Sequence, residues 1–496
     1  MFLDGRSLDG ESLEFDLCIV GGGAAGIAIA HEFIGSSLRV AIIESGGMEP
    51  DKATLELNKG NVTGRHYSIE SSRLRWFGGS TNHWEGMCAP FDELDFKERT
   101  WVRHSGWPIT HDKLYPYYAR AAKFLNMSGD TNDDFSVPQN LIESNNVLSF
   151  GCWRFAKHLS LGEVYRQSLE QATNIKAILN ANLIDIKLTD TLSSVSEMHF
   201  STLAKQKFTI KAKRYVLACG GLENARLLLA SNKQYEKGVG NWHDNVGRYF
   251  MEHPHHEAGN LFSFGSDNLA KQFHLHFKKS KGLSAVNDGL IANTSGKTLN
   301  IKLSEAAQQK YKVGGGSLVI NTTKIDQRNG PTASLLSHVF GYQAPTKKHG
   351  LYIRTEQVPN PDSRVTLSVS QKDALGMPRL QLHWMLKEQD WHTIHILAKM
   401  FAISVSANDF GVVRLYKWLG GSVKWPKHLG WGGHHMGTTR MHENVKYGVV
   451  DKDCKVHGVD NLYIAGSSVF PTSSWANPTF TIVALSTRLT DHFKRF

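Results

Sequence analysis

Paired cysteines and long apolar runs are both missing from this sequence. The five cysteines are scattered, odd in number and never spaced as CxxC, which argues against a disulfide framework and against a zinc site. The longest apolar run, IHILAKMFAISVSA, is interrupted by Lys399, so no transmembrane helix is expected. We therefore expect no metal site and a protein that works in a reducing compartment.

The first residues lack the features of an exported protein. The segment MFLDGRSLDGESLEFD is acidic and polar, with neither the basic start nor the apolar centre of a secretory signal. Together with the cysteine usage, this predicts a cytoplasmic location. Internal repeats and low-complexity tracts are also missing, and 41% hydrophobic with 21% charged residues is typical of a globular protein.

Clusters of basic residues are rare, although the formal net charge is +10. A nucleic-acid-binding protein usually concentrates lysine and arginine beside aromatic residues, and here they are spread along the chain. We therefore expect no nucleic-acid partner. The net positive charge remains compatible with anionic substrates or an anionic membrane surface.

The most informative stretch is FDLCIVGGGAAGIAIAHEFIGSSLRVAIIESGG, near the N-terminus. It predicts a buried strand over 16–20, a helix over 24–34 and a second strand over 39–43 that ends in Glu44. A carboxylate at that place can accept hydrogen bonds from ribose hydroxyls, and it argues against NADP, which favours a basic residue there. The unit predicts a dinucleotide site but does not separate FAD from NAD.

Three glycines between the first strand and the helix satisfy the GxGxxG pattern. Gly21 permits the tight turn, and Gly23 lets a pyrophosphate approach the backbone at the positive end of the helix. Gly26 allows the helix to pack closely on the strand. Each glycine therefore has its own mechanical role in holding a dinucleotide.

Two more strand–turn–helix pieces lie far along the chain. KRYVLACGGLENARLLLAS gives a strand over 215–219 and a helix over 224–230, and NLYIAGSS gives a strand over 462–465. The last helix follows Asn477, placed as its N-cap, and Pro478, placed in its first turn. Between these pieces, residues 256–430 alternate polar and apolar positions, which predicts an antiparallel sheet.

The predicted fold class is therefore α/β, with a discontinuous Rossmann-type nucleotide-binding domain and an inserted antiparallel-sheet substrate domain. The first domain is assigned residues 12–100, 160–255 and 432–496, and the second is assigned residues 101–159 and 256–431.

Five segments together resemble the glucose–methanol–choline flavoprotein oxidoreductases. They are GGGAAG, FGGSTNHW, ACGGLENARLLLAS, GGHHMGTTRM and VDKDCKVHGVDNLYIAGSSVFPTSSWANPTFTIVAL. Within that family the chain looks most similar to pyranose oxidase and to bacterial sugar and sugar-acid dehydrogenases. It departs from the family in carrying Gly466 where many members have aspartate. The resemblance implies FAD as cofactor, a two-domain fold and oxidation of a C–OH group.

The resemblance also implies which residues surround the flavin. These are Gly21, Gly23, Ala25, Gly26, Glu44, Ser45, Gly78, Gly79, Ser80, Asn82, His83, Leu183, Gly220, Ser467, Asn477, Pro478 and Thr479.

Two adjacent histidines, His434 and His435, are candidates for the catalytic base. Alcohol oxidation through a flavin moves a hydride to N5 and releases the hydroxyl proton, and a neutral imidazole is the natural acceptor for that proton. His434 aligns with the catalytic histidine of the family motif H-x-x-G-T. In extended backbone its neighbour His435 would point to the opposite face.

Asn477 and His83 each have two interpretations. Asn477 is either the N-cap of the last helix or, in addition, a partner of His434 at the substrate hydroxyl. The resemblance to pyranose oxidase suggests that His83 bonds covalently to the flavin 8α-methyl. The alternative is that it packs beside the ring, helped by backbone from Gly78 to Asn82.

The predicted function is FAD-dependent oxidation of a C–OH group in a sugar or glycoside. The alternatives are oxidation of an aliphatic or aromatic alcohol, lyase or decarboxylase chemistry on the same flavin scaffold, and a catalytically silent binding subunit. The predicted partner is a small-molecule sugar or alcohol. An electron-transfer partner subunit and a homo-oligomer are both compatible with the sequence, which identifies neither the substrate nor the electron acceptor.

Overall fold

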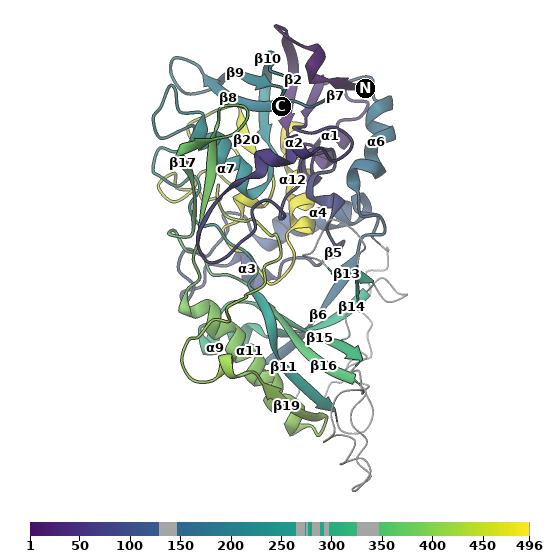
Figure 1. Cartoon of the computed structure of the whole chain (residues 1–496), viewed down its shortest axis with the longest axis vertical. Coiled ribbons are helices and arrows are strands. Elements are labelled where there is room, and N and C mark those ends of the chain that lie inside the picture. The colour runs from purple at the N-terminus through teal and green to yellow at the C-terminus, as the bar shows by residue number, and fades with distance from the viewer. Residues whose placement is uncertain are drawn as a thin grey trace.

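A computed structural model describes residues 1–127, 146–263, 273, 276–279, 288–291, 297–324 and 347–495 of the chain. Two large sheets organise it, one in the upper and one in the lower half of Figure 1. Both chain ends lie with the upper sheet. None of the helices in these residues has the length and apolarity to cross a membrane.

The upper sheet has eight strands and is mostly parallel. Its order is β1-β7-β3-β2-β10-β9-β8, and β20 also pairs with β10. The strands are β1 (Phe2–Asp4), β2 (Ser12–Val20), β3 (Val40–Ile43), β7 (Ile175–Leu179), β8 (Asn182–Leu188), β9 (Val195–Ser201), β10 (Lys207–Leu217) and β20 (Leu462–Ile464). Parallel pairs join β1, β7, β3, β2, β10 and β20, whereas β9 runs antiparallel to β8 and β10.

Helices pack on this sheet because their apolar residues enter its core. They are α1 (Ala24–His31), α6 (Leu161–Gln171), α7 (Gly220–Ala230) and α12 (Thr479–Phe493). Ile19 of β2, Ile42 of β3 and Val483 of α12 all belong to one buried cluster. The three strand–turn–helix pieces predicted from the sequence thus meet in one sheet, and the predicted fold class is confirmed.

The lower sheet has seven strands, all paired antiparallel. Its order is β19-β11-β16-β15-β14-β6-β5. The strands are β5 (Met87–Cys88), β6 (Leu148–Phe155), β11 (His255–Ser263), β14 (Lys297–Leu303), β15 (Gly316–Lys324), β16 (Lys347–Thr355) and β19 (Gly411–Leu415). Helix α11 (Glu388–Ala407) covers it and buries Ile394 and Phe401 in a second cluster with Ile320 and Ile353.

Smaller elements complete the described chain. The helices are α2 (Lys52–Leu55), α3 (Glu93–Phe96), α4 (His111–Phe124) and α9 (Glu305–Tyr311). The 3₁₀ turns are η1 (Gly5–Ser7), η2 (Glu56–Asn58), η3 (Gly79–Asn82), η4 (Lys417–Leu419) and η5 (Ser467–Val469). The remaining strands are β4 (Gly60–Gly64), β12 (His276–Lys279), β13 (Asp288–Ile291), β17 (Arg364–Lys372) and β18 (Pro378–Trp384).

Two segments assigned to the substrate domain pack instead with the upper sheet. Helix α4 packs on α12 and β18 packs on α7, two of the helices that cover the upper sheet. Leu114 and Ala121 of α4 and Leu382 and Trp384 of β18 lie in the same buried cluster as Ile19. The domain boundaries remain a prediction, and this packing is a reason to move both segments into the first domain.

Candidate active site

The turn between β2 and α1 has the geometry that its three glycines predict. Gly21 has a φ of 113°, in the left-handed region that favours glycine. A Cβ on Gly26 would lie 1.9 Å from the carbonyl oxygen of Gly21, so the helix could not approach the strand with any side chain there. A Cβ on Gly23, by contrast, would meet no atom nearer than Gly79 Cα at 4.0 Å.

This turn fits the phosphates of a dinucleotide. Gly23 is the N-cap of α1 and supplies no side-chain hydrogen bond to the helix. The first N–H groups of a helix have no partner within it and carry its positive end. Because no side chain covers this end, a pyrophosphate can approach its backbone.

A second glycine-rich segment rests directly on the first. The N–H of Gly78 donates to the carbonyl of Gly22 over 2.8 Å, and a Cβ on Gly79 would lie 3.1 Å from Gly23 Cα. The turn continues through Ser80 and Asn82 to His83, whose N–H donates to the carbonyl of Ser80 over 3.2 Å. The two glycine turns predicted to contact the flavin are therefore neighbours.

His83 follows this second turn and is largely buried. Burial lowers the pKa of its imidazole, so the ring is neutral at pH 7. A neutral ring is compatible with both predicted roles, the covalent bond to the flavin and packing beside it. The choice between them stays open.

Glu44 lies at the end of β3, where its carboxylate faces the first glycine turn. It accepts from the N–H of Gly22 over 2.9 Å and from the N–H of Gly46 over 3.0 Å. Burial raises the pKa of this carboxyl. Next to it, Ser45 donates to Asn182 Oδ1 over 2.6 Å. The ribose contact predicted for Glu44 stays a prediction.

The other residues predicted at the cofactor come from separate elements. Ala25 is buried in α1, Leu183 is buried in β8, Gly220 begins α7, Ser467 begins η5, Pro478 is the N-cap of α12 and Thr479 is its first residue.

An antiparallel bridge sets the position of His434. Met251 and Met436 exchange two backbone hydrogen bonds, of 3.0 and 3.1 Å. His253, two residues after Met251, and His434, two residues before Met436, therefore lie opposite each other, with 2.9 Å between their Nδ1 atoms. A Cβ on Gly432 would lie 2.5 Å from His434 Nδ1, so glycine makes room for the ring.

Buried charge surrounds His434. Its N–H donates to both carboxylate oxygens of Glu252, over 3.0 and 2.9 Å, and its Nδ1 lies 3.9 Å from Glu252 Oε1. The side chain of Glu252 is fully buried and that of His434 is 15% exposed. Burial, together with the positive charge of Arg354, holds the pKa of His434 well below 6.5. The imidazole is therefore neutral at pH 7.

His435 has a different environment. Its Nε2 lies 3.0 Å from Ser72 Oγ, and the Ser72 hydroxyl donates onward to the carbonyl of Ile69. The ring packs among Tyr67 and Phe250, and burial lowers its pKa to about 3. The two adjacent histidines thus point into different surroundings, as extended backbone predicts.

The prediction that Asn477 caps the last helix is wrong. Helix α12 begins at Thr479, its N-cap is Pro478, and no side chain caps it. The Asn477 amide instead accepts from Arg354 over 2.5 Å and donates to the carbonyl of Met87 over 3.1 Å. The amide oxygen thus accepts from the Arg354 side chain, which comes from β16 of the lower sheet, and not from the N–H groups of the helix.

Three site residues escaped the sequence analysis. His253 and Glu252 belong to MEHPHH, a histidine-rich segment that could have drawn attention to them. Arg354 carried no such signal, because it lies in an ordinary strand and meets Asn477 only after the two sheets have come together. Among the described residues, no group of three or more metal-binding side chains is arranged to hold a metal ion.

Comparisons with known proteins find a family model, dehydrogenase relatives and a solved structure of similar fold. A family model described as GMC oxidoreductase matches residues 359–486. The fructose dehydrogenase large subunit of Gluconobacter japonicus is 23% identical, covering 98% of each chain. The 2-methyl-1,2-propanediol dehydrogenase of Mycolicibacterium austroafricanum is 22% identical, covering 97% of this chain and 95% of that protein. A formate oxidase crystal structure matches the fold with a TM-score of 0.62 at 17% identity, covering 98% of this chain and 99% of that one.

Proposed function

Because the chain is an FAD-dependent oxidoreductase of the glucose–methanol–choline type, acting on CH–OH groups, we propose that it oxidises a C–OH group of a sugar or glycoside to a carbonyl. The carbinol carbon loses a hydride and the hydroxyl loses a proton. When bound, FAD supplies the hydride acceptor at N5. The protein must supply the proton acceptor and hold the substrate oxygen.

His434 is the proton acceptor in this proposal. The observation that carries it is a largely buried imidazole, 2.9 Å from His253 Nδ1 and neutral because its pKa lies well below 6.5. Only a neutral ring can accept a proton. When it does, the new positive charge lies 3.9 Å from the carboxyl group of Glu252. Burial raises the pKa of that carboxyl, and in its ionised form it stabilises the protonated ring.

Asn477 holds the substrate oxygen as a donor. Its amide oxygen is occupied by Arg354, and one amide N–H is used by Met87. One N–H remains, because a primary amide has two. Donation from this N–H to the substrate oxygen stabilises the negative charge that develops as the proton leaves.

The substrate class rests on the relatives. Fructose dehydrogenase matches along nearly the whole chain, which favours a sugar. The propanediol dehydrogenase, of nearly equal coverage, makes an aliphatic alcohol the second candidate. An electron-transfer partner subunit stays a prediction.

His434→Ala tests the proposed base, and His435→Gln is its matched control. Loss of a general base should slow anaerobic flavin reduction by about 10²–10⁴-fold without loss of flavin. Glutamine at 435 keeps a donor for Ser72 and should leave the rate nearly unchanged. If the His435→Gln enzyme is slow and the His434→Ala enzyme is fast, the assignment of the base to His434 is wrong.

The pH dependence of the wild type tests the same base. Because the pKa of His434 lies well below 6.5, the neutral form is present throughout the neutral range. The rate of flavin reduction should be flat above pH 6.5 and should fall only on the acid side, as the ring is protonated. A rate that still rises between pH 7 and 9 would contradict this assignment.

A panel of sugars, glycosides and simple alcohols tests the substrate class. Anaerobic bleaching of the flavin by a sugar supports the proposal, whereas bleaching by simple alcohols alone supports the second candidate. A flavin that stays oxidised with every member would favour lyase or decarboxylase chemistry. An oxygen electrode and a dye acceptor, used in parallel, identify the electron acceptor class.

A further inference from the structure

A neutral imidazole carries one N–H, so only one of its two nitrogens can accept a proton. Whether His434 is a competent base therefore depends on its tautomer. Its Nδ1 lies 2.9 Å from the Nδ1 of His253, a hydrogen-bonding distance. With both rings neutral, one of these two atoms carries the hydrogen and the other accepts it.

The surroundings of His253 decide which atom donates. His253 Nε2 lies 3.1 Å from the carbonyl oxygen of Ser473 and 2.9 Å from that of Ser474. Carbonyl oxygens only accept, so the Nε2 of His253 must carry a hydrogen. The ring is fully buried, and burial lowers its pKa to about 4. It is therefore neutral at pH 7, and its Nδ1 is a bare acceptor.

The hydrogen between the two rings then belongs to His434. Its Nδ1–H donates to His253, and its Nε2 carries a free lone pair. We propose that His253 is a positioning residue, which holds His434 as the Nδ1–H tautomer so that Nε2 takes the substrate proton. This inference rests on the proposed function of His434.

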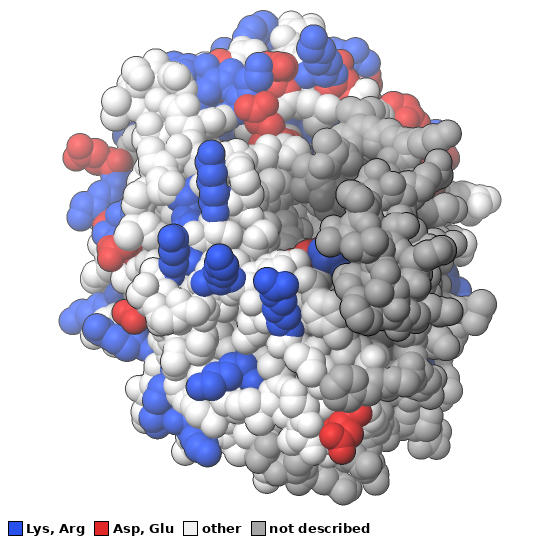
Figure 2. Space-filling view, turned by 60° about the horizontal axis from the view of Figure 1, so that its bottom comes forward, with Lys and Arg blue, Asp and Glu red and all other residues white. Residues whose placement is uncertain are grey.

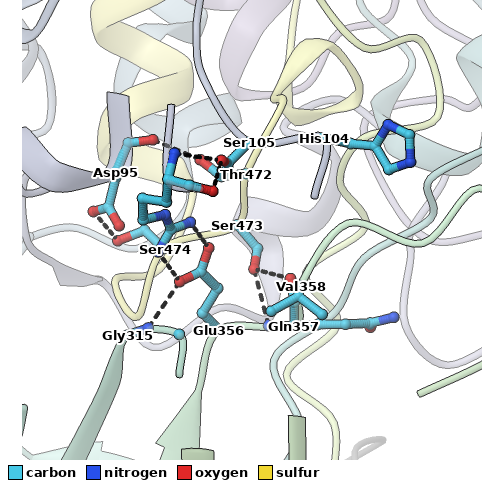
Figure 3. Close-up of polar contacts among 12 residues, drawn as sticks. Asp95, His104, Ser105, Gly315, Glu356, Gln357, Val358, Thr472, Ser473 and Ser474 are labelled. Carbon is cyan, nitrogen blue, oxygen red and sulfur yellow. Dashed lines mark hydrogen bonds and ion pairs between the residues drawn. The ribbon is translucent and has the colours of Figure 1, made fainter. Parts of the chain in front are cut away.

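The carbonyl groups that orient His253 are themselves fixed. The Ser474 hydroxyl donates to Asp95 Oδ2 over 2.6 Å. The Ser473 hydroxyl donates to the carbonyl of Gln357 and accepts from its N–H, both over 3.1 Å. Figure 3 shows both serines held in this way, from two sides. The direction of the hydrogen bond from His434 to His253 is thus set by buried backbone and does not depend on the substrate.

Proton transfer from the substrate leaves the hydrogen bond between His434 and His253 intact. The hydroxyl proton goes to His434 Nε2, and bound FAD would accept the hydride, so the substrate would lose two electrons and two hydrogens. The Nδ1–H of His434 stays on its nitrogen and keeps donating to His253. Glu252, which also accepts from the Tyr67 hydroxyl over 2.7 Å, faces the resulting imidazolium.

Two amide substitutions separate the two hydrogen bonds of His253. Asparagine places its amide oxygen near the position of Nδ1, where it can accept from His434. Glutamine places its amide nitrogen near the position of Nε2, where it can donate to the serine carbonyls but leaves His434 without an acceptor. His253→Asn should keep the anaerobic flavin-reduction rate within about threefold, and His253→Gln should slow it at least about tenfold. Equal rates in the two variants, with flavin retained, would overturn the proposal.

A double substitution tests whether His253 acts through His434. In a His434→Ala background, His253→Gln should cause no further loss of rate, because the ring it positions is gone. Independent, multiplying losses would overturn the positioning role. Normal turnover in His434→Ala alone would instead overturn the proposed function, so the two failures are distinguishable.

A measurement on the unmodified enzyme covers the case in which a variant fails to fold. In protein labelled with ¹⁵N-histidine, the signals absent from His434→Ala identify the ring nitrogens of His434. Nε2 should show the chemical shift of an unprotonated nitrogen at pH 7, and Nδ1 that of a protonated one. The opposite assignment would overturn the proposal.

Discussion

The side chain of Asn477 is oriented by two partners of opposite kind. Arg354 can only donate and the carbonyl of Met87 can only accept, so the amide oxygen must face the guanidinium and the amide nitrogen must face the carbonyl. A single amide thereby connects the lower sheet, through β16, to the start of α12. The same orientation leaves the second amide N–H for the proposed contact with the substrate oxygen.

Replacing Asn477 by aspartate removes that N–H while keeping the shape of the side chain. The carboxylate would still pair with Arg354, but it would repel the carbonyl of Met87 and would offer the substrate oxygen no donor. We expect flavin reduction to slow about tenfold or more, on the order of 1.4 kcal/mol in the barrier, as measured by anaerobic stopped-flow.

Asn477→Ala is the matched control, since it removes the donor without adding charge. Slow reduction in both variants assigns the effect to the missing N–H. Slow reduction in the aspartate variant alone assigns it to the added negative charge. Wild-type rates in a well-folded, flavin-loaded aspartate variant would refute a catalytic role for Asn477.

At the scale of elements, two glycines at the start of α1 have different surroundings. Gly26 faces the protein, where Gly21 O leaves no room for a Cβ, whereas Gly23 faces space that no protein side chain enters. Gly26 is therefore needed for the packing of the fold. Gly23 leaves room for a ligand at the N-terminal end of the helix.

Two alanine substitutions in this turn should consequently have different effects. Gly23→Ala adds a methyl group that meets no protein atom within 4.0 Å, so the apoprotein should melt normally. Its affinity for FAD should fall at least about tenfold, near 1.4 kcal/mol, in a fluorescence titration. Gly26→Ala should instead lower the melting temperature or prevent folding, because overpacking of this kind costs at least about 1–3 kcal/mol. Wild-type FAD affinity in Gly23→Ala would contradict the phosphate site.

The sequence was sufficient for elements whose cause is local and insufficient for contacts made across the fold. Strand, glycine turn and helix around Gly21 follow from periodicity and from glycine at fixed spacing, and the structure has them within a few residues. The N-cap assignment of Asn477 failed because its partner Arg354 arrives from another sheet. His253 meets His434 through the register of a single backbone bridge, which no local pattern encodes.

At the scale of the whole molecule, positive charge is in excess. The net charge is +10, and Figure 2 shows more Lys and Arg than Asp and Glu on the described part of the end that carries the lower sheet. Residues 411–430 of that end contain exposed Arg414, Lys417, Lys424 and Lys427 but no acidic residue. A surface of this kind attracts anions over a distance set by salt.

Turnover with an anionic electron acceptor should therefore depend on ionic strength. With ferricyanide, kcat/KM for the acceptor should fall about tenfold as the Debye length shrinks from about 30 Å at 0.01 M to about 8 Å at 0.15 M salt. A neutral quinone is the control and should show little change. Equal salt dependence for both acceptors would exclude steering by surface charge.

The path of the chain through the upper sheet also dictates when the protein can acquire its cofactor during biosynthesis. β2 and its glycine turn leave the ribosome early, whereas β20, which pairs with β10 at Leu217 and Ile464, and α12, which packs on α1, are made near the end. The proposed flavin site needs all of them. A nascent chain that ends before β20 lacks part of this proposed site. We therefore expect flavin capture to follow synthesis of residue 477, and a message truncated before β20 should yield colourless protein.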